Sequence, residues 1–399
     1  MKKTVLRWEI IANIALFCFA ISLFNLAGYI FAAMLAVTLF YNVRHIRIST
    51  PELTLFCFAV FYFGVFSFHY EIGIEEIILY FAGPWGAYLI GKQYVLRSRS
   101  KRPLMTLTMI LAAGMCLHGL LNWVAMLRSE HMLTYAYQRL SVDFWRGTVV
   151  SVTVTGMFFS FATGLSVGAL FSKTKKKTKI LAVVTLVACL AATIFFANRT
   201  LLVVAALMIA GYLLAVLLSS RISPARKALL LLTLGFAVVL LIAALILNWF
   251  GITDKIMSLK IIQRLDEDEG GRMAVWSLFF EDNAFLRFPM GGGQIARSSG
   301  MGYLHNLWLD IYNRTGVLPF LMMLIFTVLM IGRYFVFRKR MLDRGRHVDC
   351  TCLTALLIAT VLNCMVEPII EANPYYFLIV LMFLGGMNGQ IRNLEEAAQ

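Results

Sequence analysis

Apolar segments long enough to cross a lipid bilayer recur along the whole 399-residue chain. A transmembrane helix needs about 20 predominantly apolar residues, because the hydrocarbon core of a bilayer is about 30 Å thick. The chain is 60% hydrophobic and 14% charged. Soluble domains average about 45–50% apolar and about 25% charged residues, so this chain is more apolar and less charged than they are. These features exclude a soluble enzyme, a secreted disulfide-stabilised domain and a disordered chain.

The apolar windows predict an all-α polytopic membrane protein with about 12 transmembrane helices, forming a single integral membrane domain over residues 1–399. An even number of spans places both termini on the same side. The first window lacks a small-residue cleavage pattern, so we expect it to be retained. The expected spans lie near residues 9–24, 27–43, 52–70, 76–95, 104–127, 147–171, 180–197, 200–218, 228–250, 314–332, 351–368 and 374–391.

The distribution of Lys and Arg predicts the orientation of these spans, since basic loops collect on the cytoplasmic side. The termini and alternate loops carry 25 of the 36 basic residues and a net charge of +19, against −4 on the other side. Both termini are therefore expected in the cytoplasm. Because the positive charge follows the loops of a membrane protein, it does not indicate a nucleic-acid partner.

The largest outward connection is expected over residues 251–303, between the ninth and tenth spans. Loops on a rigid scaffold often carry function, so this extracytoplasmic loop is the first place to look for a site. Arg272 and Trp276 lie four residues apart in its first half and share a helix face. They could bind a phosphate and stack a sugar ring, or form a surface helix whose Trp packs on its neighbours.

Two further segments of this loop have candidate chemistry. Gly291, Gly292 and Gly293 lack side chains, so that their backbone N–H groups could converge on an anion, or the segment could be a hinge. His305 and Asn306 lie where the loop meets the next span, and imidazole is the usual general base near neutral pH. Asp310, five residues after His305, is not expected to orient it directly.

Charged residues at two other outer boundaries complete the set. Arg199 stands between two apolar runs, where an arginine is expensive unless an anion or water receives it, although a snorkelling side chain is an alternative. Glu367 and Glu371 flank Pro368 and could bind sugar hydroxyls or simply solvate helix ends. The acidic run at residues 266–269 lacks the alternating pattern of a calcium loop, so no metal site and no cofactor are expected.

Taken in order, these motifs resemble those of the O-antigen ligase and O-antigen polymerase superfamily of membrane glycosyltransferases. The shared region covers about residues 195–332. The family pattern of an arginine after the seventh span, Arg-x-x-x-Trp, a Gly-rich segment and His-Asn-x-x-Leu maps onto Arg199, Arg272, Trp276, Gly291 to Gly293, His305 and Asn306. Asn198 departs from the Ser or Thr that is commoner before the arginine, and the segment after Asn306 also differs.

The resemblance implies metal-independent transfer of a glycan, with inversion, from undecaprenyl pyrophosphate to a sugar hydroxyl on the outer face of the inner membrane. Arg199 and Arg272 would meet the charge of the leaving pyrophosphate, and His305 would either accept the hydroxyl proton or hold the pyrophosphate. An O-antigen or capsule polymerase is favoured over a ligase acting on lipid A-core, and a lipid-linked glycan flippase is the alternative from another class. Expected partners are the lipid-linked donor, the glycan acceptor, membrane lipid, and a flippase with a chain-length regulator.

Overall fold

The computed structural model describes residues 2–42, 48–132, 134–135, 140–196, 198–218, 223–248, 276–277, 279–280, 287–298 and 303–396. Helices dominate these segments. The long helices of the first part are α1 (Lys2–Ala20), α2 (Ala27–Asn42), α3 (Thr50–His69), α5 (Gly83–Arg97), α6 (Pro103–Arg128), α8 (Val152–Phe158) with α9 (Ser160–Phe171), α10 (Lys176–Phe195), α11 (Arg199–Leu218) and α12 (Pro224–Ile246). Short turns of helix connect some of them: η1 (Leu23–Asn25), α4 (Ile74–Glu76) and η2 (Ile77–Ala82).

The last part of the chain continues in the same way. Two short helices, α17 (Gln294–Ser298) and α18 (Leu307–Thr315), precede α19 (Val317–Asp343), α20 (His347–Val366), α21 (Ile369–Ala372) and α22 (Pro374–Glu396). Each of the twelve expected spans coincides with a helix or with two consecutive helices. Within the described residues, seven helices are long and apolar enough to cross a membrane.

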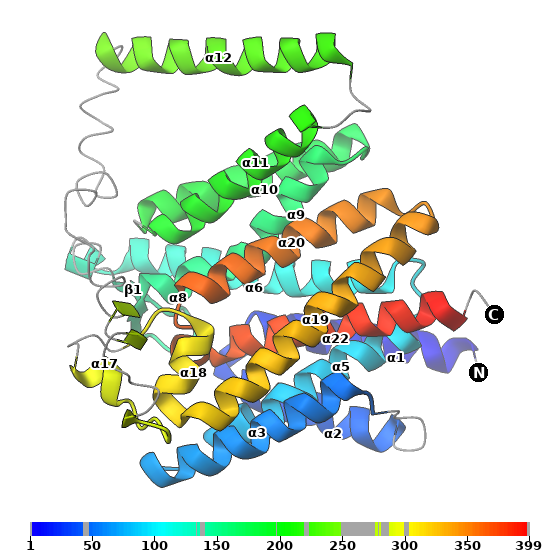
Figure 1. The fold of residues 1–399 in the computed structure, drawn as a ribbon, viewed down its shortest axis with the longest axis vertical. Coiled ribbons are helices and arrows are strands. Elements are labelled where there is room, and N and C mark those ends of the chain that lie inside the picture. Colours follow the sequence, from blue (N-terminus) through cyan, green and yellow to red (C-terminus); the bar gives the residue numbers. More distant parts are fainter. Residues whose placement is uncertain are drawn as a thin grey trace.

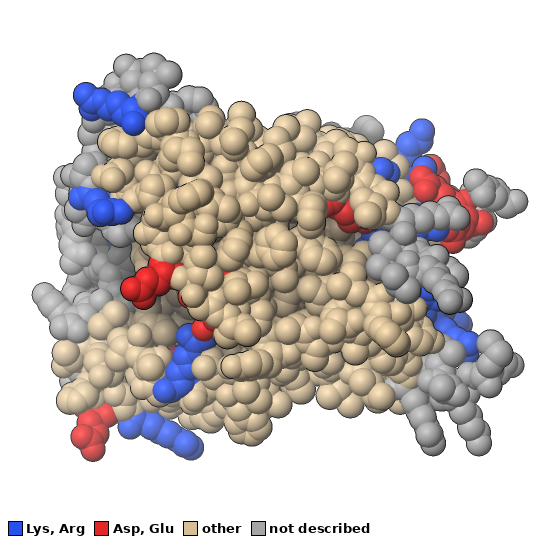
Figure 2. Space-filling model, turned by 90° about the horizontal axis from the view of Figure 1, so that it is seen from below, with Lys and Arg blue, Asp and Glu red and all other residues tan. Residues whose placement is uncertain are grey.

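The arrangement of charge agrees with a membrane protein. Figure 2 shows Lys, Arg, Asp and Glu side chains near the two ends of the helices, with a broad uncharged zone between them on the face in view. Both termini lie at one end of the molecule, and α17, α18 and the strand β1 lie at the opposite end (Figure 1). The prediction of a helical membrane protein is therefore confirmed, while the number of spans and their orientation remain predictions.

Close packing of α5 against α22 forms the centre of the bundle. A Cβ atom on Gly91 would lie 1.9 Å from the carbonyl oxygen of Met382, and one on Gly385 would lie 1.9 Å from the carbonyl oxygen of Tyr88. Glycine at these two positions lets the helix backbones touch, which is how helices associate where no water drives their contact. This packing fixes the frame on which the outer end of the bundle is built.

The structure adds a small element to the expected all-α fold. Strands β1 (Leu140–Val142) and β2 (Val149–Ser151) pair antiparallel after α6. From the sequence we expected a loop at the position of β1 and the start of a span, residues 147–171, at the position of β2. Asp143 shapes the turn between them by accepting hydrogen bonds from the backbone N–H groups of Trp145 (3.0 Å) and Arg146 (2.9 Å). The Trp145 indole then donates to the carbonyl of Ile21 (2.8 Å), which attaches the hairpin to the end of α1.

A buried histidine anchors the same hairpin to α6. Nε2 of His118 lies 3.2 Å from Oδ2 of Asp143, and the imidazole stacks on Phe158. We expect His118→Ala to lower the stability by about 1–3 kcal/mol, because Oδ2 of the buried Asp143 carboxylate would lose its side-chain partner. Thermal denaturation of the purified protein in detergent measures this effect. His131→Ala, which removes an exposed imidazole from the same connection, should leave the transition unchanged, and equal shifts in both variants would contradict the assignment.

Candidate functional site

The turn that precedes α18 is set by two polar side chains. Asn306 caps the helix by accepting hydrogen bonds from the N–H groups of Trp308 (3.1 Å) and Leu309 (3.2 Å), and it donates to the carbonyl of Met365 (3.2 Å). The carboxylate of Asp310 accepts the N–H groups of Leu304 (2.7 Å) and Asn306 (3.2 Å). Asp310 is fully buried, and burial raises its pKa. Both side chains build the turn, and Asn306 also positions its neighbour; the expected contact of Asn306 with a substrate stays a prediction.

That neighbour is His305, which the turn holds in the left-handed region at φ 54°. Its Nδ1 lies 3.9 Å from Oε2 of Glu367, and the Glu367 side chain is only 2% exposed. The separation is too long for a hydrogen bond, although catalytic contacts are often loose before substrate binds. Glu367 is therefore the carboxylate beside His305, and Asp310, which we did not expect in that role, is engaged with the backbone instead.

A second pair of opposite charges lies at the other end of α18. Nη1 of Arg314 lies 3.9 Å from Oε2 of Glu371, and the two side chains are 18% and 10% exposed. The Arg314 guanidinium also lies over the rings of Phe66 (5.1 Å), Tyr70 (4.8 Å) and Tyr80 (5.9 Å). These aromatic faces hold the cation in one place. Arg314 was not among the residues selected from the sequence.

The His305–Glu367 and Arg314–Glu371 pairs are formed by the same two segments of the chain. His305 lies two residues before α18, and Arg314 lies in the last turn of this helix. The connection from α20 through α21 supplies a carboxylate to each of them, Glu367 to His305 and Glu371 to Arg314. Two segments about sixty residues apart in the sequence thus contribute to both pairs, and α18 lies at the end of the molecule opposite the termini (Figure 1).

Beside Arg314 lies a small polar cavity. Its volume is about 290 Å³, and Tyr70, Gly293, Ala296, Arg297, Asn313, Arg314 and Glu371 line it. Nε of Arg314 and Oε1 of Glu371 are both buried and have no hydrogen-bond partner among the residues that the structure describes. Such groups are expensive to leave unpaired, and each has a free direction in which to meet a polar ligand. Arg297, which donates to the carbonyl of Gly292, adds a second cation to the wall.

The Gly-rich segment has a different role from the one expected. Gly291, Gly292 and Gly293 have φ angles of 71°, 75° and 72°, but their N–H groups already donate to the carbonyls of Phe288, Arg314 and Asn313. The expected cradle of free N–H groups for an anion is therefore wrong for this structure. The segment instead caps the C-terminal end of α18, and Gly293 reaches the cavity because it has no side chain.

Gly316, directly after α18, allows the segment that contains Pro289 to lie against the end of this helix. Its φ is 82°, and a Cβ atom there would lie 2.0 Å from the carbonyl oxygen of Pro289. We expect Gly316→Ala to destabilise the protein by about 1–3 kcal/mol and to disturb the cavity, because both the backbone angle and the contact forbid a side chain. Gly332→Ala in α19, where no atom lies within 4 Å of the new Cβ, is the matched control for a thermal denaturation measurement. Similar transitions for both variants would show that the close approach is not needed.

The remaining expected site residues lie in different positions. Arg199 begins α11 and is half-buried, at the same end of the molecule as α18 (Figure 1). Nε1 of Trp276 donates to the carbonyl of Leu304 (2.8 Å), and the ring packs beside Phe279. Trp276 thus supports the turn that carries His305, as in the packing alternative. Arg272 and most of the loop at residues 251–303 lie outside the described residues, so the expected meeting of Arg199 and Arg272 stays a prediction.

The site has the chemistry to bind an anion and to exchange a proton. In the part of the chain that the structure describes, no three His, Cys, Asp or Glu side chains are grouped as metal ligands. Comparison of the sequence with models of known protein families finds no match, and a search of curated proteins finds none either. The geometry of the two charge pairs and the order of the sequence motifs therefore carry the functional argument.

The ionisation of Glu371 gives a prediction for stability. Burial raises the pKa of this carboxyl from 4.5 to about 7, and the nearby Arg314 opposes the shift. A raised native pKa means that the native state binds more protons than the unfolded chain between these values, so stability should fall as the pH rises from about 4.5 to about 7. Thermal denaturation across this range measures the slope. Glu371→Gln, which does not titrate, should flatten it, and an unchanged slope would contradict the assignment.

Proposed function

We propose that the protein is a membrane glycosyltransferase that moves a glycan from undecaprenyl pyrophosphate to a sugar hydroxyl, with its site at the end of the bundle that carries α18. The observation that supports this most is the placement of His305 beside Glu367 in the turn before α18 and of Arg314 beside Glu371 in the last turn of the same helix. A proton acceptor and an anion site at the two ends of α18 supply the two kinds of group that transfer from a phosphorylated leaving group needs. The motif order in the sequence points to the same chemistry.

In the proposed reaction the acceptor hydroxyl oxygen bonds to the anomeric carbon of the donor glycan from the side opposite the leaving group. The bond from that carbon to the pyrophosphate oxygen breaks, and its electron pair leaves with the pyrophosphate. The hydroxyl proton passes to His305, whose imidazolium the Glu367 carboxylate stabilises. His305 thus has the role of general base in this proposal, in preference to holding the pyrophosphate.

The charge that develops on the pyrophosphate needs fixed cations. Arg314 is suited to this task because the aromatic rings and Glu371 preorganise its guanidinium, and Arg297 lines the same cavity. Arg199 and Arg272 are proposed to complete the set, as the sequence pattern implies. The planar fork of arginine grips two phosphate oxygens at once, which a lysine cannot do.

Among enzymes of this kind we propose a polysaccharide polymerase, with a ligase as the alternative. The expected loop of about fifty residues at 251–303 is shorter than we expect for an enzyme that seats a bulky lipid-anchored core as acceptor. The proposed location is the outer face of the cytoplasmic membrane. A flippase and a chain-length regulator are the proposed partners in the cell.

One observation favours a transporter of lipid-linked glycans as a second candidate. Ionisable side chains buried among membrane helices often mark a transport path, and His118 is 3% exposed inside α6 with Asp143 beside it. This pair, however, fastens the β-hairpin to α6, which is a structural role. We therefore favour the enzyme.

The product of a purified system distinguishes these functions. The full-length protein is reconstituted in proteoliposomes and given a lipid-linked oligosaccharide donor, alone or with lipid A-core. A ladder of longer lipid-linked glycans from the donor alone is expected for a polymerase, and glycan on lipid A-core only would identify a ligase. Movement of intact donor across the bilayer with no new glycosidic bond would contradict the proposed enzyme.

A further inference from the structure

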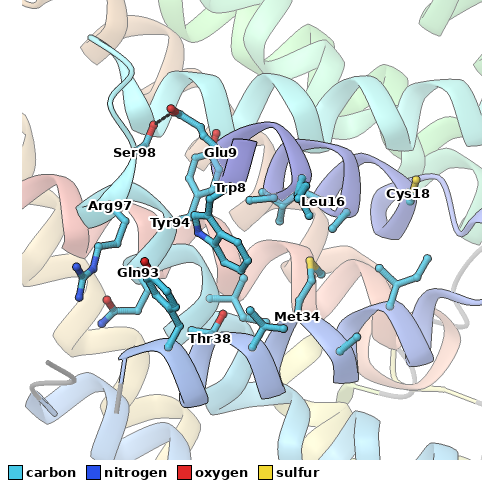
Figure 3. A pocket seen from close by; sticks show the side chains of 18 of the residues that line it. Trp8, Glu9, Leu16, Cys18, Met34, Thr38, Gln93, Tyr94, Arg97 and Ser98 are labelled. Carbon is cyan, nitrogen blue, oxygen red and sulfur yellow. Dashed lines mark hydrogen bonds between the residues drawn. The ribbon is translucent and has the colours of Figure 1, made fainter. Parts of the chain in front are cut away.

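A long apolar cavity lies away from the candidate site, between α1, α2 and α5. It has a volume of about 460 Å³, within the usual range of about 300–1,000 Å³ for ligand pockets. Figure 3 shows it as a groove between the α1 and α2 ribbons, with Trp8, Gln93 and Arg97 toward one end and Cys18 toward the other. Small side chains at Ala12, Ala15 and Ala33 leave the space open.

The length and polarity of the groove match one leaflet of a bilayer. The α1 wall from Trp8 to Cys18 extends roughly 15 Å at 1.5 Å per residue, which is about half of a hydrocarbon core about 30 Å thick. Along this length the lining is almost entirely apolar, for example Leu16, Ile30 and Met34. A narrow apolar groove about as long as one leaflet is thick suits an acyl chain better than water or a sugar.

Polar groups occur only at the end of the groove nearest the termini. There the Trp8 and Tyr41 rings stack at 5.5 Å and 18°, an aromatic pair typical of the level of lipid headgroups. Arg97 lies at this mouth and is exposed, whereas Glu9 is occupied by the Ser98 hydroxyl (Figure 3). No acidic side chain pairs with Arg97 in the described parts of the chain.

The charge around the mouth is strongly positive. Beyond Arg97, the connection to α6 carries the exposed side chains of Arg99 and Lys101, whereas Arg102 lies 3.3 Å from the carboxylate of Asp349. Basic residues at the membrane surface attract anionic headgroups, and a guanidinium is well matched to a phosphate. The mouth therefore favours an anionic phospholipid over a zwitterionic one.

We propose that this groove is a binding site for an anionic glycerophospholipid of the leaflet on the side of the termini. One acyl chain lies along α1 and α2, and the phosphate meets Arg97. The site is separate from the proposed donor site, which lies at the opposite end of the bundle (Figure 1). It does not depend on the proposed catalytic function.

The headgroup contact is tested by titrating the full-length protein in detergent with phosphatidylglycerol or phosphatidylcholine and counting bound lipids by native mass spectrometry. We expect the wild type to bind phosphatidylglycerol about fivefold more tightly. Arg97→Gln should abolish this preference. Arg99→Gln removes the same charge from a residue that does not line the groove, and it should keep most of the preference.

The acyl contact is tested by filling the groove. Ala33→Phe places a ring in the groove at an exposed helix position, and we expect it to weaken retention of phosphatidylglycerol at least about tenfold. Ala113→Phe adds the same bulk to an exposed position of α6 outside the groove and should leave retention unchanged. Wild-type retention by Ala33→Phe would overturn the proposal, and so would a preference for phosphatidylglycerol that survives Arg97→Gln. Tighter binding of undecaprenyl phosphate than of phosphatidylglycerol would also overturn it, because the groove would then belong to polyprenyl chains.

Discussion

Replacement of His305 should give the largest loss of activity, a fall in turnover of about 10²–10⁴ with donor affinity almost intact, because a general base contributes about this much. His305→Asn is the preferred variant, since asparagine tolerates the left-handed backbone at φ 54° better than most residues and the turn should persist. Single-turnover rates and donor binding, measured on the same purified variant, separate the loss of a proton acceptor from the loss of a pyrophosphate contact.

Two controls accompany this prediction. His347→Asn changes an exposed histidine at the opposite end of the bundle and should behave as wild type. Glu367→Gln should lower turnover less than His305→Asn, because it removes only the carboxylate that orients and stabilises the imidazole. Normal polymer formation by His305→Asn at normal rates would remove the residue from the mechanism, and a parallel loss of donor binding would assign it to the pyrophosphate.

Replacement of Arg314 should give the second large effect, on donor binding. Hydrogen bonds to charged groups contribute about 1.5–3 kcal/mol, so Arg314→Lys should weaken binding of the lipid pyrophosphate about 10- to 100-fold although the net charge is unchanged. The reason is geometric, because an ammonium cannot lie flat on the Phe66 and Tyr70 rings, contact Glu371 and hold two phosphate oxygens together.

The measurement for Arg314 is donor binding to the protein in nanodiscs, by competition with labelled undecaprenyl pyrophosphate. Arg344→Lys makes the same change at an exposed position at the end of α19 near the termini and should bind normally. Binding by Arg314→Lys within about twofold of wild type would mean that Arg314 only packs between the aromatic rings.

The sequence predicted a helical membrane protein because the apolar windows depend on local composition alone. It could not predict the pairing of Arg314 with Glu371, since this contact joins α18 to α21 and depends on tertiary packing. The signal was nevertheless present, because Arg314 stands at the start of an apolar run in the same kind of position that drew attention to Arg199. The cost of a charge at the membrane boundary applies equally to both residues.

Several candidate residues were found in the right region with the wrong or incomplete role. The Gly-rich segment suggested an anion cradle from its composition, but its N–H groups bond the end of α18, which only the folded chain reveals. Trp276 and Asn306 belong to the scaffold of the turn that carries His305. The β-hairpin was missed because its short strands, of three residues each, have too little alternation to stand out in an apolar chain.

Release of undecaprenyl pyrophosphate tests the central proposal most directly. Purified protein in proteoliposomes is given a labelled lipid-linked oligosaccharide in the presence of a metal chelator, and the freed lipid pyrophosphate and the new glycosidic bonds are counted together. The account predicts one lipid pyrophosphate released for each bond formed, with inverted anomeric configuration, and a strong loss of both in His305→Asn and Arg314→Lys. Donor that stays intact, or release that is unaffected by both substitutions, would contradict it.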